Sequence, residues 1–451
     1  MKKKLLQVIG LFSAILVLSG CSNANKNPGP FPVPVSENPA VSESGETIPG
    51  ETVNLTEGRT PKEIESGDVS PEQFSALSDA SVKLLYQTMQ DEEDPNKNIL
   101  ISPLSVQTAL GMAELGAEGD TLKQMEKIVN GNLSREELAL LVNSLAKTMQ
   151  NAPDVEWNVA NSLWFRDDGI IVPKEEYLND VVSHYHSDVF KAPFDNRTLK
   201  DINGWVDTET KHMIPEIISE IPEEAYMYLI NAVAFEAEWQ EPYEDDQVQE
   251  GRYFTNLDGS ETETTMLASK EYGYFTLEGG KGFLKPYKGG EYSFVGILPE
   301  EGQSPEEYLK KISSSGADFS KAVREAEDEE VNVLIPEFTQ DYNKELSEIF
   351  KEMEMEQPFN PEQAEFYQMM EPVNQSPYQV WIGKILHKTH IEVDRKGTKA
   401  AAVTAVQMEL CTAVMPVEEV KTVRLDRPFV YAVVDNATGY PVFFGVQNSM
   451  Q

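Results

Sequence analysis

Residues 384–411 read KILHKTHIEVDRKGTKAAAVTAVQMELC and contain two strand-like segments on either side of Gly397. In the first segment, side chains suited to a core alternate with mostly charged ones, which predicts a half-buried strand. The side chains on its inner face are Ile385, His387, Thr389, Ile391 and Val393. Glycine tolerates backbone conformations that other residues avoid, so Gly397 is interpreted as a pivot after this strand.

The second segment has an uncharged face of mostly small and β-branched side chains. With a period of two, this face consists of Thr398, Ala400, Ala402, Thr404, Val406, Met408 and Leu410. Such a strand could enter the middle of a sheet, because its small side chains would lie over a core without displacing it. A permanent interior strand or an Ala-rich helix would have a similar composition. The preceding strand and the pivot favour the insertable strand.

The composition predicts a folded, strongly acidic protein. The chain has 451 residues, 37 Lys and Arg against 76 Asp and Glu, a formal net charge of -39 and 2 cysteines. Its 40% hydrophobic residues are enough for a large packed core, which excludes a chain that is disordered throughout. An acidic surface repels a phosphate backbone, so nucleic acid is excluded as a main partner.

The N-terminus predicts export and lipid attachment. Three lysines precede an apolar run at residues 5–18, which is shorter than the roughly 20 residues of a membrane-spanning helix. The run ends in LSGC at residues 18–21, which resembles the lipobox of bacterial lipoproteins. We expect residues 1–20 to be a signal peptide and Cys21 to carry lipid, which would hold the protein at the cell membrane, facing the outside of the cell. A plain secretory signal with an incidental Cys21 is the alternative.

Two parts follow the signal. Residues 21–66 are rich in Pro, Ser, Asn, Glu and Gly and show no helical or strand periodicity, so they are interpreted as a tether. Residues 67–451 contain no second proline-rich linker and are expected to form one domain, which begins with a helix-capping box, SPEQ, at 70–73. Helical patterns cover 105–125 and 173–189, and strand patterns cover 226–235, 292–298, 331–338, 379–393 and 429–446.

The common signatures of enzymes are missing. The sequence has no HExxH, no GxSxG, no Walker loop and no GxGxxG after a strand. His184 and His186 have a spacing that could hold a metal, but no third ligand is evident, and neither cysteine has zinc-site spacing. We expect no metal, no cofactor and no catalytic activity.

Several short motifs resemble the serpin family, the serine protease inhibitors, over nearly all of residues 71–451. In chain order they are NILISPLS at 98–105, GAEGDT at 116–121, NGWV at 203–206, LINAV at 229–233, PYKG at 286–289, HK at 387–388, GT at 397–398, DRPF at 426–429 and FG at 444–445.

This resemblance implies an α+β serpin fold with three β-sheets, about nine helices and an exposed reactive-centre loop at about 395–424. In this family a target protease attacks the loop and forms an acyl-enzyme, and the cleaved loop then inserts into the main sheet and distorts the protease. The implied partner is an extracellular serine protease in a covalent complex, and the inhibitor itself is expected to be a monomer. No basic helix cluster is evident, so heparin-type activation is not expected.

The resemblance also implies roles for individual residues. The hinge of the loop is matched by Gly397, Thr398, Ala400, Ala401 and Ala402. The shutter, a polar cluster under the main sheet where the strands part, is matched by Ser102, Asn231 and His387. The breach, where the loop first enters the sheet, is matched by Trp239.

The scissile bond is expected between Cys411 and Thr412, from the family's usual spacing after the hinge glycine. Cys411 is small and apolar, which suits the narrow pocket of an elastase- or subtilisin-type protease. The neighbouring Met408, Leu410 and Met415 would instead favour a chymotrypsin-like protease. The segment from Cys411 to residue 428 is several residues longer than is usual in the family.

The hinge departs from the family pattern in its charge, because Arg395, Lys396 and Lys399 stand where acidic residues are usual. Two other functions remain as alternatives. One is a non-inhibitory serpin that serves as a surface binding module; bulky or charged hinge residues would favour it, and they are absent from the matched hinge positions. The other is a lipoprotein hydrolase built on Ser102 and His387, but the strand pattern places His387 on a buried face, which favours a hydrogen-bonded core role.

Overall fold

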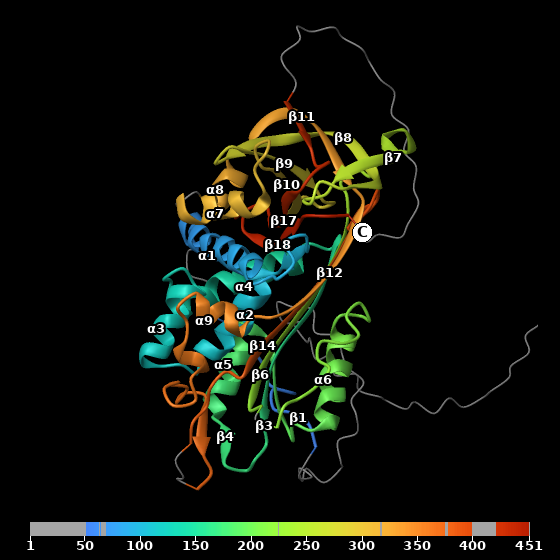
Figure 1. The fold of residues 1–451 in the computed structure, drawn as a ribbon. Coiled ribbons are helices and arrows are strands. Elements are labelled where there is room, and N and C mark those ends of the chain that lie inside the picture. Colours follow the sequence, from blue (N-terminus) through green and yellow to red (C-terminus); the bar gives the residue numbers. More distant parts are fainter. Residues whose placement is uncertain are drawn as a thin grey trace, which may run out of the picture.

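In the computed structural model the chain forms two large β-sheets and one small sheet, with helices around them (Figure 1). The structure describes residues 51–450, except residues 63, 65–68, 224, 316–317, 375–377 and 399–420. Within these residues there are nine α-helices and two short 3-10 helices. The predicted α+β fold with three sheets and about nine helices is confirmed.

The seven-stranded sheet carries the hinge. Its strand order is β1 (Val53–Asn54), β5 (Asp188–Ala192), β3 (Val155–Arg166), β6 (Met227–Glu238), β15 (Gly397–Thr398), β14 (Lys384–Val393) and β12 (Phe338–Glu345). In its centre, β6 pairs antiparallel with β3 and parallel with β14. A strand placed between β6 and β14 can therefore run antiparallel to both, and β15 does so over two residues.

The nine-stranded sheet forms the upper half of the molecule in Figure 1. Its order is β16 (Lys421–Arg424), β11 (Glu327–Pro336), β8 (Glu261–Leu277), β9 (Gly280–Pro286), β10 (Tyr292–Leu298), β17 (Phe429–Asp435), β18 (Pro441–Gln447) and β2 (Ile99–Ile101), with β7 (Val248–Thr255) paired to β8. The third sheet pairs β4 (Ile171–Pro173) with β13 (Met370–Pro372). The predicted loop at about 395–424 includes residues at both ends that belong to sheets, because β15 and β16 are strands.

Helices cover both faces of the seven-stranded sheet, and others lie beside the nine-stranded sheet. They are α1 (Pro71–Gln90), α2 (Pro103–Glu114), α3 (Gly119–Ile128), α4 (Arg135–Asn151), α5 (Glu175–Tyr185), α6 (Asn196–Glu209), α7 (Pro305–Ser315), α8 (Phe319–Arg324), α9 (Ser347–Glu352), η1 (Asp245–Gln247) and η2 (Gln357–Phe359). Figure 1 shows α6 on one face and α2, α5 and α9 on the other. None of the helices in the described ranges is long and apolar enough to cross a membrane.

Most predicted patterns fall on elements of the predicted kind. Ser70 is the N-cap of α1, and its backbone N–H donates to Gln73 Oε1 at 2.9 Å. All five side chains predicted for the inner face of β14 are buried. The predicted helix at 105–125 is instead two helices, α2 and α3. The break ends at Gly119, whose φ of +56° is a conformation that side-chain-bearing residues rarely adopt.

The folded body begins earlier than the boundary predicted between residues 66 and 67. β1 adds an antiparallel edge strand to β5. Arg59 then forms an ion pair with Glu175 at the start of α5, at 2.9 Å. The tether predicted at 21–66 is therefore too long at its C-terminal end. A strand of two residues has no periodicity, so the sequence pattern could not show it.

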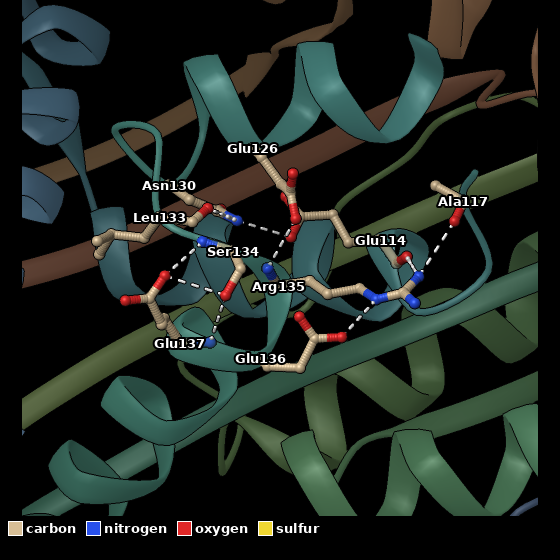
Figure 2. A network of polar contacts seen from close by, with 9 residues as sticks. All are labelled: Glu114, Ala117, Glu126, Asn130, Leu133, Ser134, Arg135, Glu136 and Glu137. Atoms are coloured by element: carbon tan, nitrogen blue, oxygen red, sulfur yellow. Dashed lines mark hydrogen bonds and ion pairs between the residues drawn. The ribbon is translucent and has the colours of Figure 1, made fainter. Parts of the chain in front are cut away.

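A partly buried polar network joins the end of α2 to the start of α4 (Figure 2). The fully buried Glu114 carboxyl group accepts a hydrogen bond from Asn130 Nδ2 at 2.8 Å, and its other oxygen has no hydrogen-bond partner in the described part of the protein. The Arg135 guanidinium donates to the backbone carbonyls of Glu114 and Ala117 at 3.2 and 3.1 Å. Burial raises the pKa of Glu114 to about 8, so this carboxyl group is neutral at pH 7.

The variant Glu114→Gln should be more stable than the wild type at pH 8, by on the order of 2 kcal/mol. Between the ordinary pKa of 4.5 and about 8, Glu114 is ionised in the unfolded chain but protonated in the folded one. Stability is therefore lost as the pH rises through this window, and a glutamine, which does not titrate, avoids the loss. Urea unfolding of both proteins at pH 5 and pH 8 measures the difference. A gap of equal size at both pH values would contradict a buried neutral Glu114.

Candidate functional site

β15 is a two-residue wedge between β6 and β14. Gly397 and Thr398 lie opposite Glu238 and Ala237 of β6, and Thr398 also lies opposite Val393 of β14. The Thr398 side chain is fully buried, on the face that the sequence pattern predicts. The segment predicted as the hinge therefore enters the sheet with its first two residues.

Gly397 fits this place because it has no side chain. A Cβ atom on it would lie 2.1 Å from Ala237 O and 2.7 Å from Glu238 Cα, closer than atoms can pack. Its φ lies outside the left-handed region that favours glycine. The pivot interpretation relied on backbone freedom, and that physical reason is wrong. The glycine allows the close approach of two backbones.

Two stacked rings hold the wedge from one side. Trp239 is 1% exposed, and its ring lies 4.6 Å from that of Tyr287 at an interplanar angle of 9°. The Tyr287 hydroxyl is hydrogen-bonded to Thr398 Oγ1 at 2.7 Å. Trp239 Nε1 donates to Asp394 O at 2.8 Å, and its backbone N–H donates to Lys396 O at 2.9 Å. Trp239, predicted for the breach, thus contacts the turn that leads into β15.

That turn is closed by Asp394. One of its carboxylate oxygens accepts from the backbone N–H groups of Lys396 at 2.7 Å and Gly397 at 3.0 Å. Its own N–H donates to Gly397 O at 2.9 Å. Arg395 forms an ion pair with Glu337 at 3.4 Å, so one of the basic residues that depart from the family pattern has an acidic neighbour.

Below β15, the direct pairing of β6 and β14 lies over a buried polar network. A hydrogen bond between His387 Nδ1 and Asn231 Oδ1 joins the two strands. Asn231 Nδ2 donates to Asn161 Oδ1 on β3 at 2.6 Å and to Ser105 Oγ on α2. The Ser102 backbone N–H donates to His387 Nε2 at 3.1 Å. The structure therefore brings the three predicted shutter residues together, and Ser105 and Asn161 complete the network.

His387 is a neutral, structural side chain in this network. Because Nε2 accepts from the Ser102 N–H, the ring proton lies on Nδ1 and is donated to Asn231. Burial lowers the pKa of His387 to about 3. The Ser102 hydroxyl donates to Val442 O at 2.8 Å instead of facing His387. These two residues therefore do not have the geometry of a nucleophile and its base.

Sequence reasoning missed a buried ion pair beside the breach. Lys285 Nζ lies 2.7 Å from Glu271, and the two side chains are 2% and 10% exposed. The Lys285 ammonium group also lies 4.3 Å from the ring centre of Tyr243 and 5.3 Å from that of Trp239. No motif indicates this pair. Lys and Glu are common throughout the sequence, and only the fold determines which of them are buried.

The remaining predicted site residues, Ala400, Ala401, Ala402, Cys411, Thr412 and Cys21, lie outside the described residues. Across the described ranges, no group of three or more His, Cys, Asp or Glu side chains is placed to hold a metal ion.

The chain belongs to the serpin family, since the family model described as Serpin (serine protease inhibitor) matches residues 75–449. The leukocyte elastase inhibitor A of Mus musculus is 28% identical over 387 residues, covering 83% of this chain and 98% of that protein. Members of this family are typically protease inhibitors and not enzymes, in agreement with the sequence-based expectation that the chain is not an enzyme.

The fold is similar to that of tengpin, a thermophilic serpin with two relevant crystal structures. Its native state has a TM-score of 0.79 at 35% identity, covering 89% of this chain and 100% of that one. Its latent state has a TM-score of 0.69 at 33% identity, covering 87% and 100%. The structure described above is thus more similar to the native form than to the latent form.

Stability should fall as the pH drops from about 6.5 toward 3, in part because of His387. In this window the unfolded chain protonates His387 and the folded protein does not, so acid favours unfolding. His387→Asn should cost about 1 to 3 kcal/mol at pH 7 through lost hydrogen bonds. It should then lose less stability than the wild type between pH 7 and pH 4.5. Urea unfolding at both pH values provides the comparison, and identical pH slopes would contradict a neutral His387.

Proposed function

We propose that this protein inhibits extracellular serine proteases as a suicide substrate, through cleavage of its reactive-centre loop, trapping of the acyl-enzyme and insertion of the loop into the seven-stranded sheet. The observation that carries the proposal is β15. Its two residues occupy the upper end of the position between β6 and β14 and run antiparallel to both. The residues that follow would need only to extend this strand.

The register of β15 defines where an extended strand would lie. Continued residue by residue, it sets Met408 opposite Met227 and Gly383. β6 and β14 already bring these two residues together, because the Gly383 N–H donates to Met227 O at 3.0 Å. The strands would therefore part sideways by one strand spacing, about 4.8 Å, without sliding along each other.

Insertion in this register would place a suitable side chain in the shutter. Thr398 faces the core, so every second residue after it would also face the core. Thr404 would lie between Asn231 and His387. Its hydroxyl could then replace the hydrogen bond that these two side chains lose when the strands part.

The same register supports insertion of the basic residue Lys399. Its side chain would lie on the opposite face of the sheet, next to Glu236 of β6 and Glu392 of β14. Cross-strand pairs of opposite charge stabilise a sheet, whereas an acidic residue here would face two like charges. A lysine at this position is therefore compatible with insertion.

We propose an elastase- or subtilisin-type protease as the target, with cleavage after Cys411. A small apolar residue fits the narrow specificity pocket of such enzymes. The name of the Mus musculus relative, an elastase inhibitor, supports this class. In the inserted register Cys411 would lie opposite Val380, beyond the start of β14, so the bound protease would be carried to the lower end of the sheet.

We further propose that the protein acts as a monomer held by lipid on Cys21 at the cell membrane, facing outward. β1 pairs with β5 at the lower end of the seven-stranded sheet in Figure 1, and β15 lies at the opposite end. A tether that leads into β1 would thus reach the body from the end remote from the hinge. The reactive-centre loop would then be directed away from the membrane.

The wild-type protein should form a covalent complex with an elastase-type protease that survives SDS, and Thr398→Arg should abolish it. Insertion would have to bury an arginine where Thr398 is fully buried, so hydrolysis should be faster than insertion. We expect at least a tenfold smaller fraction of complex on SDS gels, with the loop cleaved. Lys399→Arg, which changes the outward-facing neighbour and keeps its charge, is the matched control. Unchanged inhibition by Thr398→Arg would rule out loop insertion as the mechanism.

The variant Cys411→Arg should lose inhibition of the elastase-type protease and gain inhibition of a trypsin-type protease, whose pocket is built around an aspartate. Cys411→Ala keeps a small side chain and should retain the original target. Mass spectrometry of the peptide released by cleavage should give Thr412 as its first residue. Retained elastase inhibition by Cys411→Arg would show that the scissile bond lies elsewhere.

A further inference from the structure

The direct pairing of β6 and β14 ends below in two stacked aromatic rings. Tyr226 directly precedes β6, and Trp381 lies shortly before β14. Their ring centroids are 5.4 Å apart at an interplanar angle of 20°, and both side chains pack against the core beneath the sheet. Just above them the backbones are in close contact, because a Cβ atom on Gly383 would lie 2.8 Å from Met227 O.

The two segments that carry the rings are bound to different sides of the position that an inserted strand would take. On the β6 side, the Tyr226 hydroxyl donates to Asp168 at 3.1 Å, and the Tyr226 carbonyl accepts from the backbone N–H of Arg166 on β3 at 2.9 Å. On the β14 side, the N–H of Ile382 donates to Pro358 O in η2 at 2.9 Å. Lateral separation of β6 and β14 would therefore pull the two rings apart.

We propose that Tyr226 and Trp381 form a clasp that must open before the last residues of the loop can enter between β6 and β14. This inference rests on the proposed function. In the register of β15, Glu409 would lie opposite Tyr226, and Leu410 opposite Trp381. The residues just before the scissile bond would thus have to pass between the two rings, whereas the first part of the loop would insert above them.

The clasp has opposite effects before and after cleavage. In the intact protein it opposes complete insertion of the uncut loop and so preserves the active form. After cleavage it delays the final step of insertion, which competes with hydrolysis of the acyl-enzyme. An aromatic pair of this kind corresponds to about a 2- to 10-fold change in a rate or an equilibrium constant. The stack of Tyr226 on Trp381 would thus influence the fraction of protease that is trapped, because it slows the last step of insertion.

Two synthetic peptides test the clasp on the intact protein without any protease. One has the sequence of residues 399–411 and would cross the clasp, and the other has that of residues 399–406 and would end opposite Leu229 and Ile385, above it. Native gels measure the rate at which each fluorescently labelled peptide is incorporated. Trp381→Ala should accelerate uptake of the long peptide about 3- to 10-fold and leave uptake of the short peptide within about 2-fold.

Two further variants separate the stack from other effects. Tyr226→Phe removes the hydrogen bond to Asp168 but keeps the ring, so it should take up both peptides at the wild-type rate. Tyr226→Leu removes the ring on the β6 side of the stack and should reproduce the effect of Trp381→Ala, which removes the ring on the β14 side. Equal acceleration of both peptides by these two variants would show general loosening and overturn the clasp, as would no acceleration of the long peptide.

The wild-type protein distinguishes failure of the clasp from failure of the proposed function. A wild type that incorporates neither peptide and forms no covalent complex with any serine protease of the proposed class would overturn the proposed function. A wild type that incorporates both peptides, with Trp381→Ala behaving identically, would overturn the clasp alone.

Discussion

The pairing of β6 with β14 is the interaction on which the rest of the structure depends. It joins two parallel strands directly from Tyr228 to Ala234 on one side and from Lys384 to His390 on the other, while β15 separates them at the top. An inserted strand would replace one ladder of hydrogen bonds by two. While β6 and β14 are paired directly, the hydrogen bonds that an inserted strand would form with each of them are not made. They can form only after the pairing of β6 with β14 is broken.

Buried polar groups set part of the barrier to breaking it. The hydrogen bond between Asn231 and His387 spans the two strands, and both side chains are fully buried. Parting the strands leaves both groups without this partner in an apolar layer, where an unpaired polar group is costly. The depressed pKa of His387 has the same origin, because the core also disfavours the charged imidazolium. Thr404, once inserted between Asn231 and His387, would lower the free energy of the inserted state. It would not lower the free-energy cost of parting the strands beforehand.

The sequence predicts the elements that depend on local pattern and misses those that depend on distant backbone. Alternation in residues 385–393 gives the buried face of β14, and the same period places Thr398 inward. Gly397 is recognised as special, but its actual constraint comes from Ala237, far away along the chain. The resemblance to serpins supplies Ser102, Asn231 and His387, while local pattern alone would give only a buried histidine.

Contacts between residues far apart in the sequence could not be predicted for the same reason. Tyr226 and Trp381 stand outside the strand motifs and meet only because β6 and β14 are adjacent. Asn161, which joins β3 to the shutter, has no distinguishing neighbours in the sequence. β1 is too short to have a pattern, and its place at the edge of β5 is decided by an open strand edge that the sequence does not reveal.

The basic residues at the hinge show how a departure from a family pattern can be compensated within one structure. Arg395 is paired with Glu337, which lies just before β12, on the far side of β14. Lys399, once inserted, would stand between Glu236 and Glu392. An acidic hinge in these surroundings would meet like charges in a protein whose net charge is already -39. The basic hinge residues and their acidic neighbours therefore compensate each other. Lys399 is compatible with insertion because each of the two strands beside it would offer a glutamate.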